Sequence, residues 1–422
     1  MILSNATVPL LGLVDTAILG HLDRPVFLAS AALGASALGF MYWAFNFLRM
    51  GTTGETAQAC GRDDHDLAVL LRPSLIALLI ATVLLIFRTP LAEFALTLMT
   101  QAGEMRALAI GYCETRLLSA PAVLLTYVMI GWFIGRGWTT VPLLILLTVN
   151  LLNIALDWWF IVELDLESQG AAWATVCSDY VGLLVGVGAG WRHIRQHGLS
   201  LSPHTIWNTA AMLRSLAING DLFIRTVALL FAFAFFHSRG ALISESVVAA
   251  NAILLNLLML AAFGLDGFAL AAESLSGQAL GRRDFGAFRA TVAECARWTA
   301  ATTCLFVLLF WALKPWVGML FSASIDVRAL LASHYHWLLL LTLGAAPSYL
   351  FDGIFVGATR TREMCYTMLG CVLLVYLPVW YLTQGWANHG LWFSFLLFNI
   401  GRGLSLGWIY RSRQAVSDWL DV

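Results

Sequence analysis

Apolar stretches separated by short polar segments follow one another along the whole chain. A stretch of about 20 apolar residues is long enough to cross the roughly 30 Å hydrocarbon core of a bilayer as an α-helix. The first stretch starts with the chain and has neither a positively charged segment nor a small-residue cleavage site, which favours a membrane helix over a removable signal. Twelve membrane-spanning helices are predicted, near residues 2–20, 27–55, 69–98, 107–135, 139–162, 169–190, 208–236, 246–276, 289–320, 330–358, 364–384 and 389–410.

A repeat divides these twelve predicted helices into two sets of six. Residues 58–64 (QACGRDD), after the second helix, match residues 278–284 (QALGRRD), after the eighth, at an offset of 220 (278 minus 58). Residues 131–135 (GWFIG) in the fourth helix resemble residues 353–357 (GIFVG) in the tenth, at an offset of 222 (353 minus 131). Short matches also arise by chance in loops rich in Gly and Arg, but two matches at nearly equal offsets in equivalent helices favour a true repeat.

The repeat predicts two lobes that lie in the same orientation. Six helices per copy leave the second copy oriented like the first, which implies a pseudo-twofold axis along the membrane normal and a cleft between the halves. We therefore expect an N-terminal lobe over residues 1–195, a cytoplasmic linker over 196–207 and a C-terminal lobe over 208–422. Two lobes around a central cleft are typical of alternating-access transporters.

The composition supports an all-α integral membrane protein. Hydrophobic residues make up 60% of the 422 residues and charged residues only 12%, with a mean hydropathy of +0.79. Soluble proteins carry about 25% charged residues. The net charge of −1 provides no basic field for a nucleic acid, so that class of partner is excluded.

The distribution of arginine predicts the orientation in the membrane. Lys314 is the only lysine, and arginines gather in the loops after even-numbered helices and in the C-terminal tail, whereas loops after odd-numbered helices hold few. By the positive-inside rule, both termini are expected in the cytoplasm. The arginines that set this orientation are Arg62, Arg72, Arg136, Arg192, Arg195, Arg282, Arg283, Arg289, Arg360, Arg362, Arg411 and Arg413.

The sequence predicts neither a metal centre nor a cofactor. Most of the seven cysteines lie inside apolar runs without a CxxC motif, and most of the nine histidines stand at segment ends. No HExxH motif, histidine pair or Ser/Lys constellation supports an integral-membrane enzyme. We expect a transporter.

Ionisable residues inside the bilayer cost several kcal/mol each, so each one needs a partner or a function. Asp15 lies in the first predicted helix with no cation nearby in the sequence. Asn150, Asn153 and Asp157 stand at i, i+3 and i+7 of the fifth helix and form one polar stripe. A stripe of this kind is expected to face protein or water.

The sixth predicted helix adds Thr175 and Asp179, which are four residues apart and share a face. Two buried acids close together cannot both ionise cheaply, which suits a proton carrier. We interpret Asp15 and Asp157 as the carboxylates of a cation or proton site, with Asn153 and Thr175 as neutral oxygen ligands. The alternative for Asp157 is a solvated position at the outer interface, beside the acidic loop that follows.

The second half carries a different set of polar residues. Asp221 and Arg225, at i and i+4 of the seventh helix, are placed to pair on one face. The eighth helix contributes Asn251, Asp266 and Glu273. A structural role is favoured here, because a self-neutralising pair needs no ion.

Pro9 stands six residues before Asp15 and removes one backbone hydrogen bond from the first helix. Bending at Pro9 would couple the shape of this helix to protonation of Asp15. A static packing kink is the commoner role of such a proline.

Four motifs together resemble the multidrug and toxic compound extrusion (MATE) family, in its bacterial branch named after the DNA-damage-inducible protein F (DinF). They are residues 14–22 (VDTAILGHL), 221–226 (DLFIRT), 249–252 (AANA) and 266–273 (DGFALAAE). The resemblance covers the whole chain. It implies two six-helix lobes in a V shape around a central cleft, and a cation antiporter driven by protons or sodium.

The resemblance also implies the site and its partners. The family's acid of the first helix falls on Asp15, its Asn and Asp of the fifth on Asn153 and Asp157, and its hydroxyl of the sixth on Thr175. We expect export of cationic or amphipathic organic compounds by a monomer in the lipids of a bacterial inner membrane. One departure is the start of the chain, because relatives have a longer first helix and Met1 stands only 14 residues before Asp15.

A flippase for lipids or lipid-linked oligosaccharides, which shares the broader architecture, is the alternative function. It needs a cationic cleft for a pyrophosphate, and Arg225 is the chief inner arginine recognised in the sequence. A passive channel is disfavoured, because buried carboxylates in a two-lobe repeat suit rocking lobes better than a fixed pore.

Overall fold

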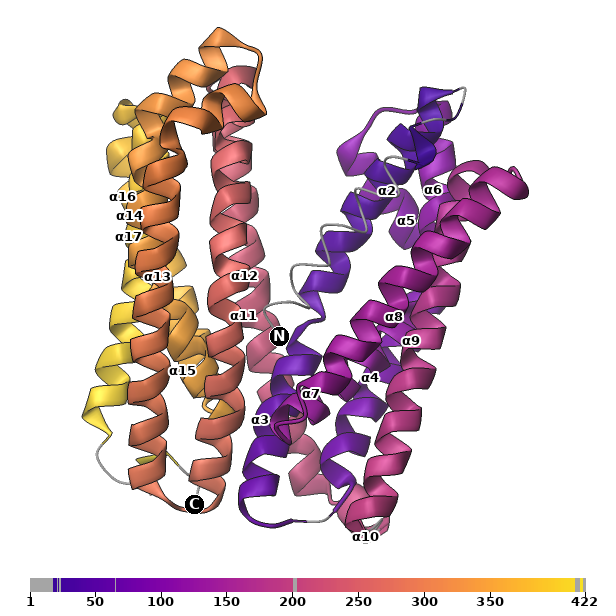
Figure 1. Ribbon diagram of the computed structural model, residues 1–422, viewed down its shortest axis with the longest axis vertical. Helices are drawn as coiled ribbons and strands as arrows, with labels where there is room; N and C mark the ends of the chain where they lie inside the picture. The colour runs from indigo at the N-terminus through magenta and orange to yellow at the C-terminus, as the bar shows by residue number, and fades with distance from the viewer. Residues whose placement is uncertain are drawn as a thin grey trace. The chain divides into compact units, whose positions relative to one another are not determined.

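The computed structural model describes residues 18–20, 22, 24–64, 66–199, 203–413 and 418–419, and in these residues the regular structure is helical (Figure 1). Nine of the described helices are long and apolar enough to cross a membrane, or ten if the bent pair α6 and α7 counts as one span. The predicted helix 2–20 lies almost entirely outside the described residues. Each of the other eleven predicted spans overlaps a helix or a broken helix.

The helices of the first half cover the predicted spans after the first, but the spans 27–55 and 69–98 are each divided into two helices. They are α2 (Pro25–Ala44), α3 (Phe47–Gly61), α4 (Ala68–Ile86), α5 (Arg88–Met99), α6 (Glu104–Leu117), α7 (Ala120–Gly135), α8 (Thr140–Asp157), the π-helix η1 (Trp158–Glu163), α9 (Glu167–His197) and the short α10 (Pro203–Ile206).

The helices of the second half are longer, and most are continuous. They are α11 (Thr209–Ala241), α12 (Glu245–Gly281), α13 (Phe285–Phe321), α14 (Ile325–Gly357), α15 (Thr361–Gly370), the π-helix η2 (Cys371–Tyr376), α16 (Leu377–Thr383), the 3₁₀ helix η3 (Gln384–Trp386) and α17 (Asn388–Ser412).

The predicted span 107–135 is broken. α6 and α7 meet at an angle of 51°. Pro121, in the first turn of α7, has no N–H to donate to the carbonyl of Leu117, so the helix cannot continue unbroken through this point. The hydroxyl of Ser119 donates to the carbonyl oxygen of Arg116 at 2.9 Å and satisfies one of the released acceptors.

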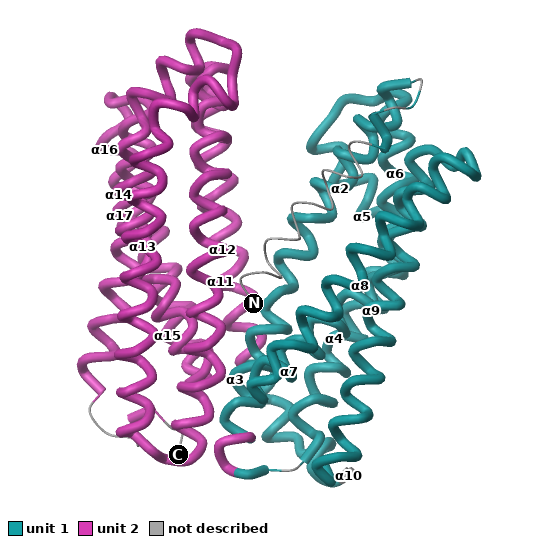
Figure 2. The backbone as a smooth tube through the Cα atoms, viewed as in Figure 1, with its two compact units in different colours: residues 1–59, 63–217 teal, residues 60–62, 218–422 magenta. Residues whose placement is uncertain are grey.

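The residues fall into two compact units (Figure 2). Unit 1 comprises residues 1–59 and 63–217, and unit 2 comprises residues 60–62 and 218–422. Gly61 accounts for the assignment of residues 60–62, because a Cβ on Gly61 would collide with the carbonyl oxygen of Gln278 and lie 2.8 Å from the Cα of Gly281, at the end of α12.

Both copies of the second repeated motif make close helix contacts. In unit 1, a Cβ on Gly135 of α7 would lie 2.7 Å from the carbonyl oxygen of Thr53 in α3. In unit 2, a Cβ on Gly357 of α14 would collide with the carbonyl oxygen of Glu273 in α12. Small residues spaced four apart let membrane helices approach closely, so the repeated GxxxG pattern has a packing cause in each unit.

The C-terminal segment is anchored in unit 2 by Trp419, which is 1% exposed. Its ring centroid lies 5.1 Å from that of Phe288 in α13 and 5.3 Å from that of Phe355 in α14. The side chain of Arg360 donates to the carbonyl oxygens of Trp419 (3.0 Å) and Asp418 (2.9 Å). These contacts join the ends of several helices that lie far apart in the sequence.

Candidate ion-coupling site

Three of the predicted site residues meet between α8 and α9 of unit 1. The amide of Asn153 lies 2.8 Å from Oδ2 of Asp157, one turn further along α8. The same amide lies 3.0 Å from Oγ1 of Thr175 in α9. The i, i+4 spacing on α8 and the hydroxyl on α9 therefore form one hydrogen-bonded cluster.

Local helix features position these groups. Asp157 is the last residue of α8, and the backbone continues directly into the π-helix η1, a distortion that is frequent at functional sites. Gly170, near the start of α9, lets α9 approach η1, because a Cβ at Gly170 would lie 3.0 Å from the carbonyl carbon of Phe160. The Thr175 hydroxyl donates to the carbonyl oxygen of Ala171 at 2.9 Å, which fixes its rotamer.

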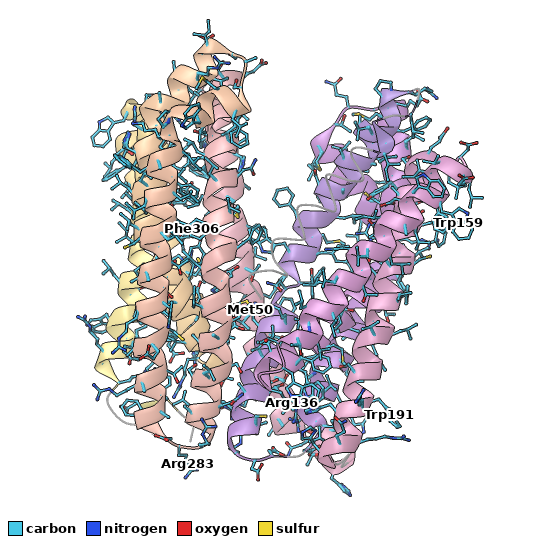
Figure 3. The ribbon with its side chains drawn as sticks, in the orientation of Figure 1. Met50, Arg136, Trp159, Trp191, Arg283 and Phe306 are labelled. Atoms are coloured by element: carbon cyan, nitrogen blue, oxygen red, sulfur yellow. The ribbon has the colours of Figure 1, made fainter. Side chains whose placement is uncertain are left out.

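The cluster is deeply buried. Asn153 and Asp157 are 0% exposed and Thr175 is 7% exposed. The alternative of a solvated Asp157 at the outer interface is therefore wrong. The neighbouring Trp159 on η1, which is 51% exposed, occupies the outward position instead (Figure 3).

The amide of Asn153 fits either protonation state of Asp157. When Asp157 is ionised, the amide N–H₂ faces its carboxylate, and the amide oxygen accepts from the backbone N–H of Thr175 at 3.3 Å. In the opposite amide orientation the N–H₂ donates to Oγ1 of Thr175 at 3.0 Å, and the amide oxygen faces Oδ2 of Asp157, where it is placed to accept from a protonated carboxyl. A half-turn of one amide exchanges the two patterns.

Two further residues of the predicted list flank this cluster on α8 and α9. Asn150 is half-buried one turn earlier on α8. Asp179, one turn after Thr175, pairs with Arg116 of α6, with 3.1 Å between Nη1 and Oδ2. Asp15 and Pro9 lie outside the described residues.

The expected pair of Asp221 and Arg225 is wrong. Arg225 of α11 forms an ion pair with Asp352 of α14, and Arg402 of α17 binds the same carboxylate oxygen at 2.7 Å. Asp221 instead accepts a hydrogen bond from the hydroxyl of Thr361 at 3.2 Å. Arg225 and Arg402 are both buried and need a carboxylate in the interior. Asp352 of α14 provides it, so Arg225 does not pair with Asp221.

This charge network is buried in unit 2. Arg225 is 6%, Asp352 8% and Arg402 3% exposed. Glu273 of α12, 3% exposed, lies within electrostatic range of Arg225, so four helices contribute two positive and two negative charges. The network therefore neutralises itself.

The remaining candidates of the eighth predicted helix have separate surroundings. Asn251 exchanges hydrogen bonds with Asn388 of α17 at 2.8 and 3.0 Å and accepts from the indole of Trp392 at 2.8 Å. It clamps α12 to α17. Asp266 is half-buried and lies within electrostatic range of Tyr349 in α14.

The sequence reasoning missed two inner arginines. Arg116 and Arg402 join Arg225 in the interior, so the view that Arg225 is the chief one is wrong. Both arginines lie inside predicted spans, 107–135 and 389–410. This position could have identified them as inner arginines, because an arginine within an apolar span needs an acidic partner.

Among the residues that the structure describes, no group of three His, Cys, Asp or Glu side chains is placed to hold a metal ion. The cluster of Asp157, Asn153 and Thr175 offers carboxylate, amide and hydroxyl oxygens, the ligand types that hard monovalent and divalent cations accept. It suits a proton on the carboxylate or a sodium ion completed by further oxygens.

Comparison with known proteins identifies the family. The MatE family model matches residues 1–159 and 223–382. The chain is 37% identical over 423 residues to the DNA damage-inducible protein F of Escherichia coli K12, a match that covers 99% of this chain and 92% of the relative. The chain belongs to the MatE family. The resemblance to MATE transporters and their DinF branch is confirmed.

More distant relatives agree with this assignment. The MatE chain is 27% identical to the chloroplastic protein DETOXIFICATION 44 of Arabidopsis thaliana, over 96% of this chain and 79% of the relative. A crystal structure of the Vibrio cholerae MATE transporter VcmN superposes with a TM-score of 0.85 at 20% identity, covering 100% of this chain and 96% of that one. The predicted all-α fold of MATE transporters is therefore confirmed, and the protein is a multi-pass membrane transporter of the multidrug-efflux type.

Proposed function

We propose that this MatE transporter is an antiporter that exports cationic or amphipathic organic compounds while protons, or sodium ions, move inward. It would work by alternating access as a monomer in a bacterial inner membrane, with both termini cytoplasmic. Asp15 would be the main coupling carboxylate, on the strength of the sequence motif around it. The buried cluster of Asp157, Asn153 and Thr175 supports this function most directly.

A buried carboxylate is a suitable coupling group because burial raises the free energy of its charged form far more than that of its neutral form. The ionised form loses its hydration and depends on hydrogen bonds such as the one that Asn153 can donate. Inward movement of one positive charge releases about 2.3 kcal/mol per 100 mV of membrane potential. This free energy is enough to sustain a substrate gradient of more than about tenfold.

Coupling also requires that the ion bind the two conformations of the transporter differently. An ion with equal affinity for both conformations shifts no equilibrium. The substrate must therefore bind more weakly to the outward-facing form once the carboxylate has taken up its proton. The two hydrogen-bond patterns of the Asn153 amide provide a local difference that a conformational change can favour or disfavour.

Ethidium efflux from inverted membrane vesicles tests the proposal. Proton and sodium gradients are imposed separately on the wild type, Asp15→Asn and Asp157→Asn. Asparagine keeps the shape of the side chain and removes its titration, so each variant is expected to lose gradient-driven efflux. Asp326→Asn is the matched control, because Asp326 is an exposed acid in the first turn of α14.

The outcomes separate the possible ions and roles. Undiminished efflux by both Asp15→Asn and Asp157→Asn would exclude carboxylate coupling at this site. Efflux driven by sodium without a proton gradient would reassign the ion. Loss of efflux in Asp326→Asn would show that any lost acid impairs the assay.

The flippase alternative gains no support from unit 2. A pyrophosphate would need arginines with excess positive charge, whereas Arg225 and Arg402 share the carboxylate of Asp352. We therefore retain the antiporter.

A further inference from the structure

A cavity of about 330 Å³ lies where the end of α13 packs against the beginning of α14 in unit 2. Its inner wall is apolar and firmly packed: Val317 is 3%, Leu331 2% and Tyr335 1% exposed. The hydroxyl of Tyr335 donates to the carbonyl oxygen of Phe310 at 2.8 Å and holds this wall together. The cavity is therefore a formed feature of the α13–α14 pair.

Two positive charges border the cavity. Lys314 of α13 and Arg328 of α14 line it with exposed side chains, and neither forms an ion pair within the described part of the chain. Nε of Arg328 donates to the carbonyl oxygen of Ser322 at 2.6 Å, which fixes the guanidinium beside the α13–α14 loop.

The α13 side of the cavity has the exposure expected of a surface that faces lipid. Only 11% of the most apolar stretch of α13 is buried within the protein, against 61% for α14. Trp311 and Trp316, on either side of Lys314 in the sequence, are 66% and 64% exposed. Exposed tryptophans near a helix end are typical of the membrane–water interface. Figure 3 shows Phe306 further along the same helix.

We propose that the α13–α14 cavity binds an anionic phospholipid, with the phosphate between Lys314 and Arg328 and an acyl chain along the exposed face of α13. The apolar wall suits a hydrocarbon chain, and the two cations without acidic partners suit a phosphate. In the proposed orientation this lipid belongs to the outer leaflet. The proposal does not depend on ion coupling at Asp15 or Asp157.

Lipid retention by the purified transporter tests this site. The protein in neutral detergent is mixed with phosphatidylglycerol or with phosphatidylcholine of the same acyl chains, and bound lipids are counted by native mass spectrometry. The wild type is expected to prefer phosphatidylglycerol. Each lost basic residue should weaken phosphatidylglycerol binding about fivefold, so Lys314→Gln with Arg328→Gln should weaken it about 25-fold.

Two further variants separate charge from shape. Arg289→Gln with Arg297→Gln removes two exposed positive charges from the other end of α13 and should keep the wild-type preference. Ala332→Trp leaves both cations in place but fills the cavity from its exposed rim, and it should also weaken phosphatidylglycerol binding. Size-exclusion elution and the thermal unfolding midpoint report whether each variant is folded.

Several results would overturn the proposal. Equal binding of the two lipids by the wild type would remove the anionic preference, and an unchanged preference in Lys314→Gln with Arg328→Gln would place it elsewhere. An equal loss in the Arg289/Arg297 variant would indicate nonspecific charge. Full competition by glycerol 3-phosphate would indicate a phosphate site that does not use the acyl chain.

Discussion

Single residues in this protein act mainly through the burial of charge. Asp157 lies against the amide of Asn153, which also contacts the hydroxyl of Thr175. Asp352, by contrast, is held between Arg225 and Arg402. Asp352 therefore joins α11, α14 and α17 through two ion pairs, whereas Asp157 faces a neutral amide.

Asp352→Asn is expected to lower the free energy of unfolding by about 3–5 kcal/mol, because it leaves Arg225 and Arg402 buried without their shared carboxylate. The loss is measured as a fall in the thermal unfolding midpoint in detergent. Glu294→Gln is the control, since its ion pair with Arg297 is 57% and 71% exposed and should contribute little. An equal effect of the two substitutions would contradict a special role for the buried network.

At the scale of elements, glycine spacing decides which helices pack closely. Gly131 and Gly135 bring α7 against α3, and Gly353 and Gly357 bring α14 against α12. The polar Asn251–Asn388 contact then joins α12 to α17. Close backbone contact and interhelical hydrogen bonds replace the hydrophobic driving force that membrane helices lack among lipid chains.

Gly357→Ala is expected to destabilise the protein by about 1–3 kcal/mol, because the new methyl group overlaps the Glu273 carbonyl and pushes α14 away from α12. Gly188→Ala on α9 is the control, since nothing lies within 4 Å of its added Cβ. Alanine there should be neutral or stabilising by up to about 1 kcal/mol. Thermal unfolding of both variants measures the difference, and a stabilised Gly357→Ala would refute the close contact.

At the scale of the whole molecule, the two units share a close GxxxG helix contact but hold different polar groups. Unit 1 contains the buried carboxylate cluster between α8 and α9. Unit 2 contains a self-neutralised charge network and the cavity bordered by Lys314 and Arg328. A repeat therefore preserves helix packing while the polar residues inside each copy diverge.

The proposed orientation predicts which loops are accessible from each side. In a background with the native cysteines replaced by serine, Arg283→Cys, between α12 and α13, should react with a membrane-impermeant maleimide in inverted vesicles but not in intact spheroplasts. Ala323→Cys, in the exposed turn between α13 and α14, should show the opposite pattern. The reverse result would place the termini outside the cytoplasm.

The sequence by itself predicted the helices after the first span, the two repeated motifs and the polar residues Asp157, Asn153 and Thr175, but left open whether Asp157 is buried or solvated. Apolar runs of bilayer length leave few structures other than helices, and the i, i+4 spacing fixes which polar groups share a helix face. The break between α6 and α7 was partly visible in Pro121. The π-helix after Asp157 was not visible, because an inserted residue changes the local geometry without changing the composition.

Only the tertiary structure decided the partners of the buried charges. Asp221 stood at the ideal spacing for Arg225, yet Arg225 pairs with Asp352, 127 residues away. Spacing along one helix shows which groups are able to pair. Burial decides which of them do pair, because a buried arginine without a carboxylate raises the free energy of the folded state far more than an outer aspartate without an arginine. Burial depends on how separate helices pack, and that is a property of the folded chain.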